Sequence, residues 1–150
     1  MTSRAEIDDF LSQPALALAG ASRSGRKFGN AVLKELTAKG YRVFPIHPEA
    51  DLLGGVRAYR SLRDLPEPVG GLVLVVPKPQ AAALVKEAAE AGIRRVWLQQ
   101  GAESPEAIEA GRAAGLTVIA GECVLMFARD AAFIHRAHRW VMGVFGKLPA

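Results

Sequence analysis

Short apolar runs alternate with helical segments along the chain, and this alternation constrains the fold more than any other feature of the sequence. The apolar runs at residues 16–21, 41–46, 71–76, 95–99 and 117–120 have the length and composition of strands. Helical patterns lie at residues 3–11, 31–40, 79–92 and 104–115, and a closing amphipathic helix is expected at 131–144. Strands and helices in this order imply right-handed crossovers, so the sequence predicts a doubly wound, mostly parallel sheet of the α/β class.

The length and composition predict one domain. The run at 71–76 is apolar throughout, as expected for a central parallel strand that is covered on both faces. Residues 53–66 form an irregular segment with at most a short strand. A chain of 150 residues, half of them hydrophobic, can bury one proper core. We therefore expect a single three-layer domain that comprises residues 1–150.

The charge and the cysteine content limit the kinds of ligand and of cellular compartment that we expect. The formal charge of +4 comes from Arg and Lys residues that are scattered along the chain, which favours a small anionic ligand over nucleic acid. Cys123 is the single cysteine, so an internal disulfide framework or a multi-cysteine zinc site is excluded. No secretory segment and no apolar run of membrane-spanning length is apparent. We expect a cytoplasmic protein without a membrane partner.

The predicted topology places the ligand site. In doubly wound sheets, ligands bind outside the carboxyl ends of the strands, where the strand order reverses. This rule selects residues 20–27, 45–48, 76–79 and 99–101. The first of these segments belongs to the stretch GASRSGRKFGN at residues 20–30, between a predicted strand and a predicted helix. Glycines at such a position let backbone N–H groups face an anion that the helix N-terminus also attracts.

The glycine loop departs from two common nucleotide motifs. Arg26 and Lys27 stand where the phosphate loop of nucleoside triphosphatases has Lys and then Ser or Thr, so the magnesium-binding hydroxyl is missing. Ser22 occupies the second glycine position of the dinucleotide fingerprint. The second strand ends in His47 and Pro48 rather than in an acid for the NAD ribose. NADP remains open as the ligand of an oxidoreductase or a redox-sensing protein, since Arg42 or His47 can meet a 2′-phosphate.

Coenzyme A fits the loop in another way. This nucleotide carries a pyrophosphate, a 3′-phosphate and a neutral pantetheine arm. Arg23, Arg26 and Lys27 supply cations for the phosphates, and residues 76–79 can form a wall for the arm. The alternative is that these cations are solvated charges in a turn.

Five segments in a characteristic order carry a further signal: Ala19-Gly20-Ala21-Ser22, Val43-Phe44-Pro45-Ile46-His47-Pro48, Val75-Val76-Pro77, Trp97-Leu98-Gln99-Gln100-Gly101-Ala102 and Gly121-Glu122-Cys123. Together they resemble the small stand-alone CoA-binding proteins of bacteria. The Rossmann-like domain of that family is similar to the N-terminal domain of the succinyl-CoA synthetase alpha subunit and of ADP-forming acyl-CoA synthetases. The resemblance covers most of the chain. Gly71 and Gln99-Gln100 depart from the residues that such relatives usually carry.

The resemblance implies non-catalytic binding of CoA or an acyl-CoA. Residues 22–27 are expected to bind the phosphates, and His47 and Pro48 to lie near the adenosine end. Val76 and Pro77, with Gln100 and Gly101, are expected to flank the nucleotide or the pantetheine arm. The full set of predicted cofactor-binding residues is Gly20, Ala21, Ser22, Arg23, Ser24, Gly25, Arg26, Lys27, Pro45, His47, Pro48, Val76, Pro77, Lys78, Pro79, Gln99, Gln100 and Gly101.

No catalytic or metal-binding residues are predicted. The related synthetases use a phosphorylated histidine on a further domain and a separate nucleotide-binding partner, so a synthetase subunit or a second copy of the chain is the expected protein partner. His135 and His138 lack a third ligand and are interpreted as solvated basic positions. Cys123 stands beside Val124 and Leu125, which favours a small buried hydrophobe over a reactive thiol.

Overall fold

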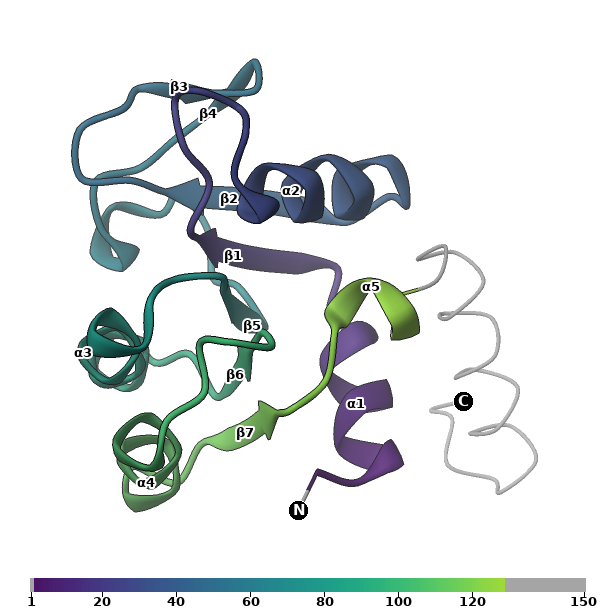
Figure 1. Cartoon of the computed structure of the whole chain (residues 1–150), viewed down its shortest axis with the longest axis vertical. Coiled ribbons are helices and arrows are strands. Elements are labelled where there is room, and N and C mark those ends of the chain that lie inside the picture. Colours follow the sequence, from purple (N-terminus) through teal and green to yellow (C-terminus); the bar gives the residue numbers. More distant parts are fainter. Residues whose placement is uncertain (1, 129–150) are drawn as a thin grey trace, which may run out of the picture.

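The computed structural model describes residues 2–128 (Figure 1). The predicted closing helix at 131–144, with His135 and His138, lies outside these residues. The elements in chain order are helix α1 (Arg4–Leu11), strand β1 (Ala15–Ala19), helix α2 (Phe28–Ala38), strands β2 (Arg42–Ile46), β3 (Leu52–Leu53) and β4 (Val56–Arg57), the 3₁₀ turn η1 (Leu62–Asp64), strand β5 (Gly71–Leu74), helix α3 (Lys78–Glu90), strand β6 (Arg95–Leu98), helix α4 (Pro105–Ala113), strand β7 (Thr117–Ala120) and helix α5 (Val124–Phe127).

Five strands form one parallel sheet in the order β2-β1-β5-β6-β7. The chain moves outward from β1 to β2, returns to the other side of β1 for β5, and then continues through β6 to β7. The strand order therefore reverses between β1 and β5. This arrangement confirms the predicted doubly wound α/β sheet, and it makes the carboxyl ends of β1 and β5 the place where a ligand is expected.

Side chains alternate between two buried cores, one on each face of the sheet. Leu16, Leu18 and Val73 join the core that is covered by α1, α2 and α5. Ala17 and Leu72, their neighbours along the strands, join the core that is covered by α3 and α4. Both faces are thus sealed by helices, as Figure 1 shows. This is why β5 is apolar at every position.

Aromatic packing closes the first core. Trp97 on β6 is fully buried, and its ring lies 5.3 Å from that of Phe10 on α1 in an edge-to-face contact. The indole Nε1–H donates to the backbone oxygen of Glu122 at 3.0 Å. Trp97 is therefore a packing residue whose polar atom is satisfied.

Two segments differ from the sequence prediction. Residues 52–57 form a β3–β4 hairpin rather than one short strand, because Gly54 and Gly55 both have positive φ and close a tight turn. A short helix, α5, follows Cys123, although the sequence suggested no element there. Within residues 2–128, no helix combines the length and the apolar composition needed to cross a bilayer.

Candidate functional site

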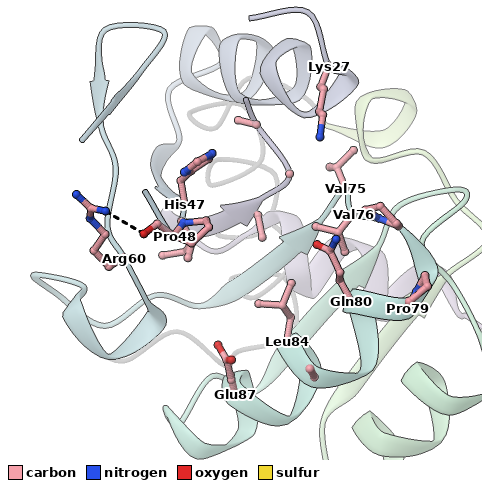
Figure 2. A pocket seen from close by; sticks show the side chains of 16 residues that line it. Lys27, His47, Pro48, Arg60, Val75, Val76, Pro79, Gln80, Leu84 and Glu87 are labelled. Atoms are coloured by element: carbon pink, nitrogen blue, oxygen red, sulfur yellow. Dashed lines mark hydrogen bonds between the residues drawn. The ribbon is translucent and has the colours of Figure 1, made fainter. Parts of the chain in front are cut away.

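A cavity of about 580 Å³ opens at the carboxyl ends of β1, β2 and β5, where the strand order reverses (Figure 2). Its volume lies in the range of roughly 300–1,000 Å³ that is typical of small-molecule sites. Three parts of the chain form its walls: the two ends of the β1–α2 loop, the segments after β2 and β4, and the β5–α3 connection with α3. The lining residues are Ala19, Gly20, Ala21, Lys27, Ile46, His47, Pro48, Arg60, Val75, Val76, Pro77, Pro79, Gln80, Ala83, Leu84 and Glu87.

Two glycines bring the backbone of three elements into contact beneath the cavity. Gly20 has a φ of +121°, and a Cβ added there would lie 2.6 Å from the carbonyl carbon of Val75. A Cβ on Gly29 would lie 2.7 Å from the backbone nitrogen of Ala21. The first turn of α2 therefore packs directly on the loop backbone. Side chains at these positions would push the β1 loop away from β5 and from the helix.

Asn30 holds the glycine loop in shape. Its Oδ1 accepts from the backbone N–H of Ser22 at 2.9 Å, and its Nδ2–H donates to the Ser22 carbonyl at 2.9 Å. The hydroxyls of Ser22 and Ser24 lie 2.9 Å apart. Sequence reasoning missed Asn30. Its position, three residues after the N-cap Lys27, was the available signal, because side chains there can reach back to the preceding loop.

The three cations of the loop lie in different places. Lys27 lines the cavity and makes no ion pair within residues 2–128. The Arg23 guanidinium pairs with the Glu49 carboxylate at 2.8 Å, and both side chains are exposed. Arg26 lines a separate groove along the outer side of α2, which Lys27 also borders, and Arg26 does not line the cavity. Lys27 is thus the loop cation placed to meet a ligand in the cavity.

The wall after β2 carries two positioned donors. His47 Nδ1 accepts from the backbone N–H groups of Glu49 and Ala50 at 3.0 and 2.9 Å, so the ring proton is assigned to Nε2. Arg60 donates to the Pro48 carbonyl and to the Asp51 carboxylate, each at 2.9 Å. Sequence reasoning missed Arg60 because it belongs to the irregular segment, where no periodic pattern indicates which way a side chain points.

Helix α3 contributes one face to the opposite wall. Gln80, Leu84 and Glu87 are four and three residues apart, so they follow one another along the same side of the helix. Sequence reasoning missed Gln80 and Glu87. Their spacing could have identified them. Pro77 and Pro79 had already been assigned to the site, and residues further along the same side of that helix are expected to line it as well.

The structure brings eight of the predicted cofactor-binding residues to the cavity. These are Gly20, Ala21, Lys27, His47, Pro48, Val76, Pro77 and Pro79. The other predicted residues do not line it: Ser22, Arg23, Ser24, Gly25, Arg26, Pro45, Lys78, Gln99, Gln100 and Gly101. Their roles in binding stay predictions.

The segment after β6 has structural contacts of its own. Gln99 is 2% exposed, and its Oε1 accepts from the backbone N–H of Val124 at 2.9 Å. Gln100 Nε2–H donates to the Gly121 carbonyl at 3.4 Å. Cys123 is half-buried at the N-cap of α5.

In the part of the chain that the structure describes, no three His, Cys, Asp or Glu side chains come together as a metal site.

Comparisons with known proteins agree with this geometry. Residues 15–129 match the CoA binding domain family. The chain is 29% identical over 129 residues to the alpha subunit of an ADP-forming acetate–CoA ligase from Pyrococcus furiosus, covering 79% of this chain and 28% of that subunit. It therefore spans about a quarter of the length of that relative.

Two smaller proteins match over most of their length. YneT of Bacillus subtilis, an uncharacterized protein, is 28% identical over 123 residues, which cover 81% of this chain and 91% of YneT. The solved structure of a conserved hypothetical protein from Pyrococcus furiosus superposes with a TM-score of 0.71 at 41% identity, over 75% of this chain and 97% of that protein. With a cavity at the reversal point of a Rossmann-like sheet and a match over residues 15–129, the chain belongs to the family of CoA-binding domains.

Proposed function

We propose that the chain binds CoA or an acyl-CoA in the cavity, with the phosphates at the β1–α2 loop, and that it acts as a binding module without catalytic machinery of its own. The observation that carries the proposal is the open N-terminus of α2 beside the cavity. Its N-cap, Lys27, makes no side-chain capping bond. The N–H of Asn30 donates to the Lys27 carbonyl at 3.0 Å, whereas those of Phe28 and Gly29, the first two of an eleven-residue helix, are left for an anion, which the helix dipole also favours.

The backbone of Gly20 and Ala21 supports the same site. Gly20 presents no side chain, so a phosphate can approach the loop closely. Lys27 adds a cation without an acidic competitor among residues 2–128. The His47 Nε2–H and the Arg60 guanidinium, on the wall after β2, add donors for a second phosphate. Besides its pyrophosphate, CoA carries a 3′-phosphate on its ribose.

The extent of the matched region supports the proposed noncatalytic role. Residues 15–129 correspond to the family's binding domain, and the chain covers 28% of the ligase subunit. Ligation of an acyl group to CoA would then depend on a partner chain, either a synthetase subunit or another enzyme that receives the bound CoA. We propose that residues 1–150 work as one such binding domain.

Isothermal titration with a set of nucleotides tests the ligand. CoA is expected to bind more tightly than dephospho-CoA, NADP, NAD or ATP, because it alone combines a pyrophosphate with a 3′-phosphate and a pantetheine arm. The affinity is expected to fall as salt rises, since charged contacts carry the binding. Equally weak binding of all five would contradict the proposal, and a preference for NADP over CoA would favour an NADP-dependent oxidoreductase or redox sensor.

Alanine variants on α2 test the place of the phosphates. Lys27→Ala is expected to weaken CoA binding about tenfold, the effect of losing one charge-assisted hydrogen bond. Lys34→Ala is the matched control, because Lys34 lies on α2 and borders the same outer groove as Lys27 but does not line the cavity. Arg26→Ala is expected to have a smaller effect than Lys27→Ala. Equal affinities in the Lys27 and Lys34 variants would remove the phosphates from this end of the cavity.

A further inference from the structure

The cavity has two ends of different chemistry. Figure 2 places Lys27 at one end and Glu87 at the other. Glu87 is exposed on α3 and makes no ion pair or hydrogen bond through its carboxylate within residues 2–128. An ionised carboxylate accepts hydrogen bonds and repels anions. The Glu87 end therefore suits a hydrogen-bond donor and disfavours a phosphate.

The donors of the cavity are also divided between two places. Lys27 and the α2 N-terminus lie on the loop side, whereas His47 and Arg60 lie on the wall after β2. Arg60 is held by its bonds to Pro48 and Asp51, which leaves other guanidinium N–H groups for a ligand. In CoA, both charged groups belong to the adenosine half, and the pantetheine arm is neutral. Two separate groups of donors thus fit the adenosine half better than the arm.

We propose that the cavity holds the adenosine half of CoA and that the Glu87 carboxylate accepts a hydrogen bond from the 6-amino group of adenine. This inference rests on the proposed function, because it assigns an orientation to CoA in the same cavity. Pro48, Val76 and Leu84 supply rigid apolar surface for the base. The acceptor at Glu87 then selects adenine over a base with a 6-carbonyl group, because two acceptors would face each other.

Calorimetry with two bisphosphates tests this role directly. The probes are adenosine 3′,5′-bisphosphate and inosine 3′,5′-bisphosphate, and CoA is titrated alongside. Adenine has a 6-amino donor and an unprotonated N1, whereas hypoxanthine has a 6-carbonyl acceptor and an N1–H. The wild-type protein is expected to prefer the adenosine compound about tenfold. In Glu87→Gln this preference is expected to vanish, because an amide can either accept from the amine or donate to the carbonyl.

Glu90→Gln is the matched control. Glu90 lies on the same helix, three residues further along, pairs with Arg63 at 3.3 Å and does not line the cavity. This variant is expected to keep the tenfold preference. If CoA binds but the wild type does not distinguish the two bases, or if both variants change the ratio alike, the role of Glu87 is overturned and the proposed function stands. If CoA does not bind, both are overturned.

Discussion

Replacement of Gly20 by alanine probes the backbone contact on which the cavity is built. The φ of +121° costs a residue with a side chain about 1–3 kcal/mol. The added Cβ would also lie 2.6 Å from the carbonyl carbon of Val75, and this contact involves backbone that cannot rotate away. Overpacking of that kind costs typically about 1–3 kcal/mol. Added together, these costs lead us to expect that Gly20→Ala lowers the free energy of unfolding by about 2–6 kcal/mol.

Gly25→Ala is the control for the cost of placing a residue with a side chain at a positive φ. Gly25 has a φ of +73°, and a Cβ there would have nothing within 4 Å. Its replacement is expected to cost about 1 kcal/mol, from the left-handed conformation alone. Both variants reduce the entropy of the unfolded chain by the same amount, so that contribution cancels in the comparison.

Urea unfolding followed by circular dichroism measures both variants. The Gly20 variant is expected to unfold at a clearly lower urea concentration than the Gly25 variant, with an unchanged dependence of the unfolding free energy on urea. If both variants lost the same free energy of unfolding, the reasoning would be refuted. The close approach of the β1 loop to Val75 would then make no contribution to stability.

Two further predictions concern stability away from the cavity. Ser3 and Glu6 form a capping box on α1, and the backbone bond from Ser3 holds the pKa of Glu6 below its ordinary value of 4.5. A carboxylate with a lowered pKa stabilises the fold at a pH above its ordinary pKa, and this stabilisation is lost as the pH falls through the folded-state pKa. Glu6→Gln is therefore expected to shift the urea midpoint more at pH 7 than at pH 3. An equal shift at the two pH values would contradict this expectation. A Cβ on Gly71 would lie 2.5 Å from the Phe10 ring, so Gly71→Ala is expected to cost about 1–3 kcal/mol. Combined with Phe10→Leu, the same substitution is expected to cost less, and additivity in a double-mutant cycle would show that the ring is not the obstacle.

The fold could be predicted because its signals are local. Apolar runs that alternate with helical patterns indicate a parallel sheet without any knowledge of long-range contacts. The observed strands begin within one residue of the predicted runs. The ends differ more, because Val75 and Val76 continue the apolar run after the ladder of β5 has stopped and instead line the cavity. Apolar composition alone does not distinguish a paired residue from a cavity wall.

The site could be predicted only in part. Residues that directly follow β1, β2 and β5 meet at one edge, because the carboxyl ends of parallel strands always do. Arg60 comes from an irregular segment, and its direction depends on bonds to Pro48 and Asp51. Gln99 follows β6 at the same edge, but its side chain turns inward to the backbone of Val124.

The sequence by itself determined the alternation of strands and helices along the chain and the glycine loop after the first strand. These depend on periodicity and on single-residue preferences, which act between near neighbours in the chain. Only the tertiary structure decided that Lys27 faces the cavity while Arg23 pairs with Glu49, and that Glu87 stands at the opposite end. The direction of a charged side chain depends on partners far away in sequence, and those partners come together only when the chain is folded.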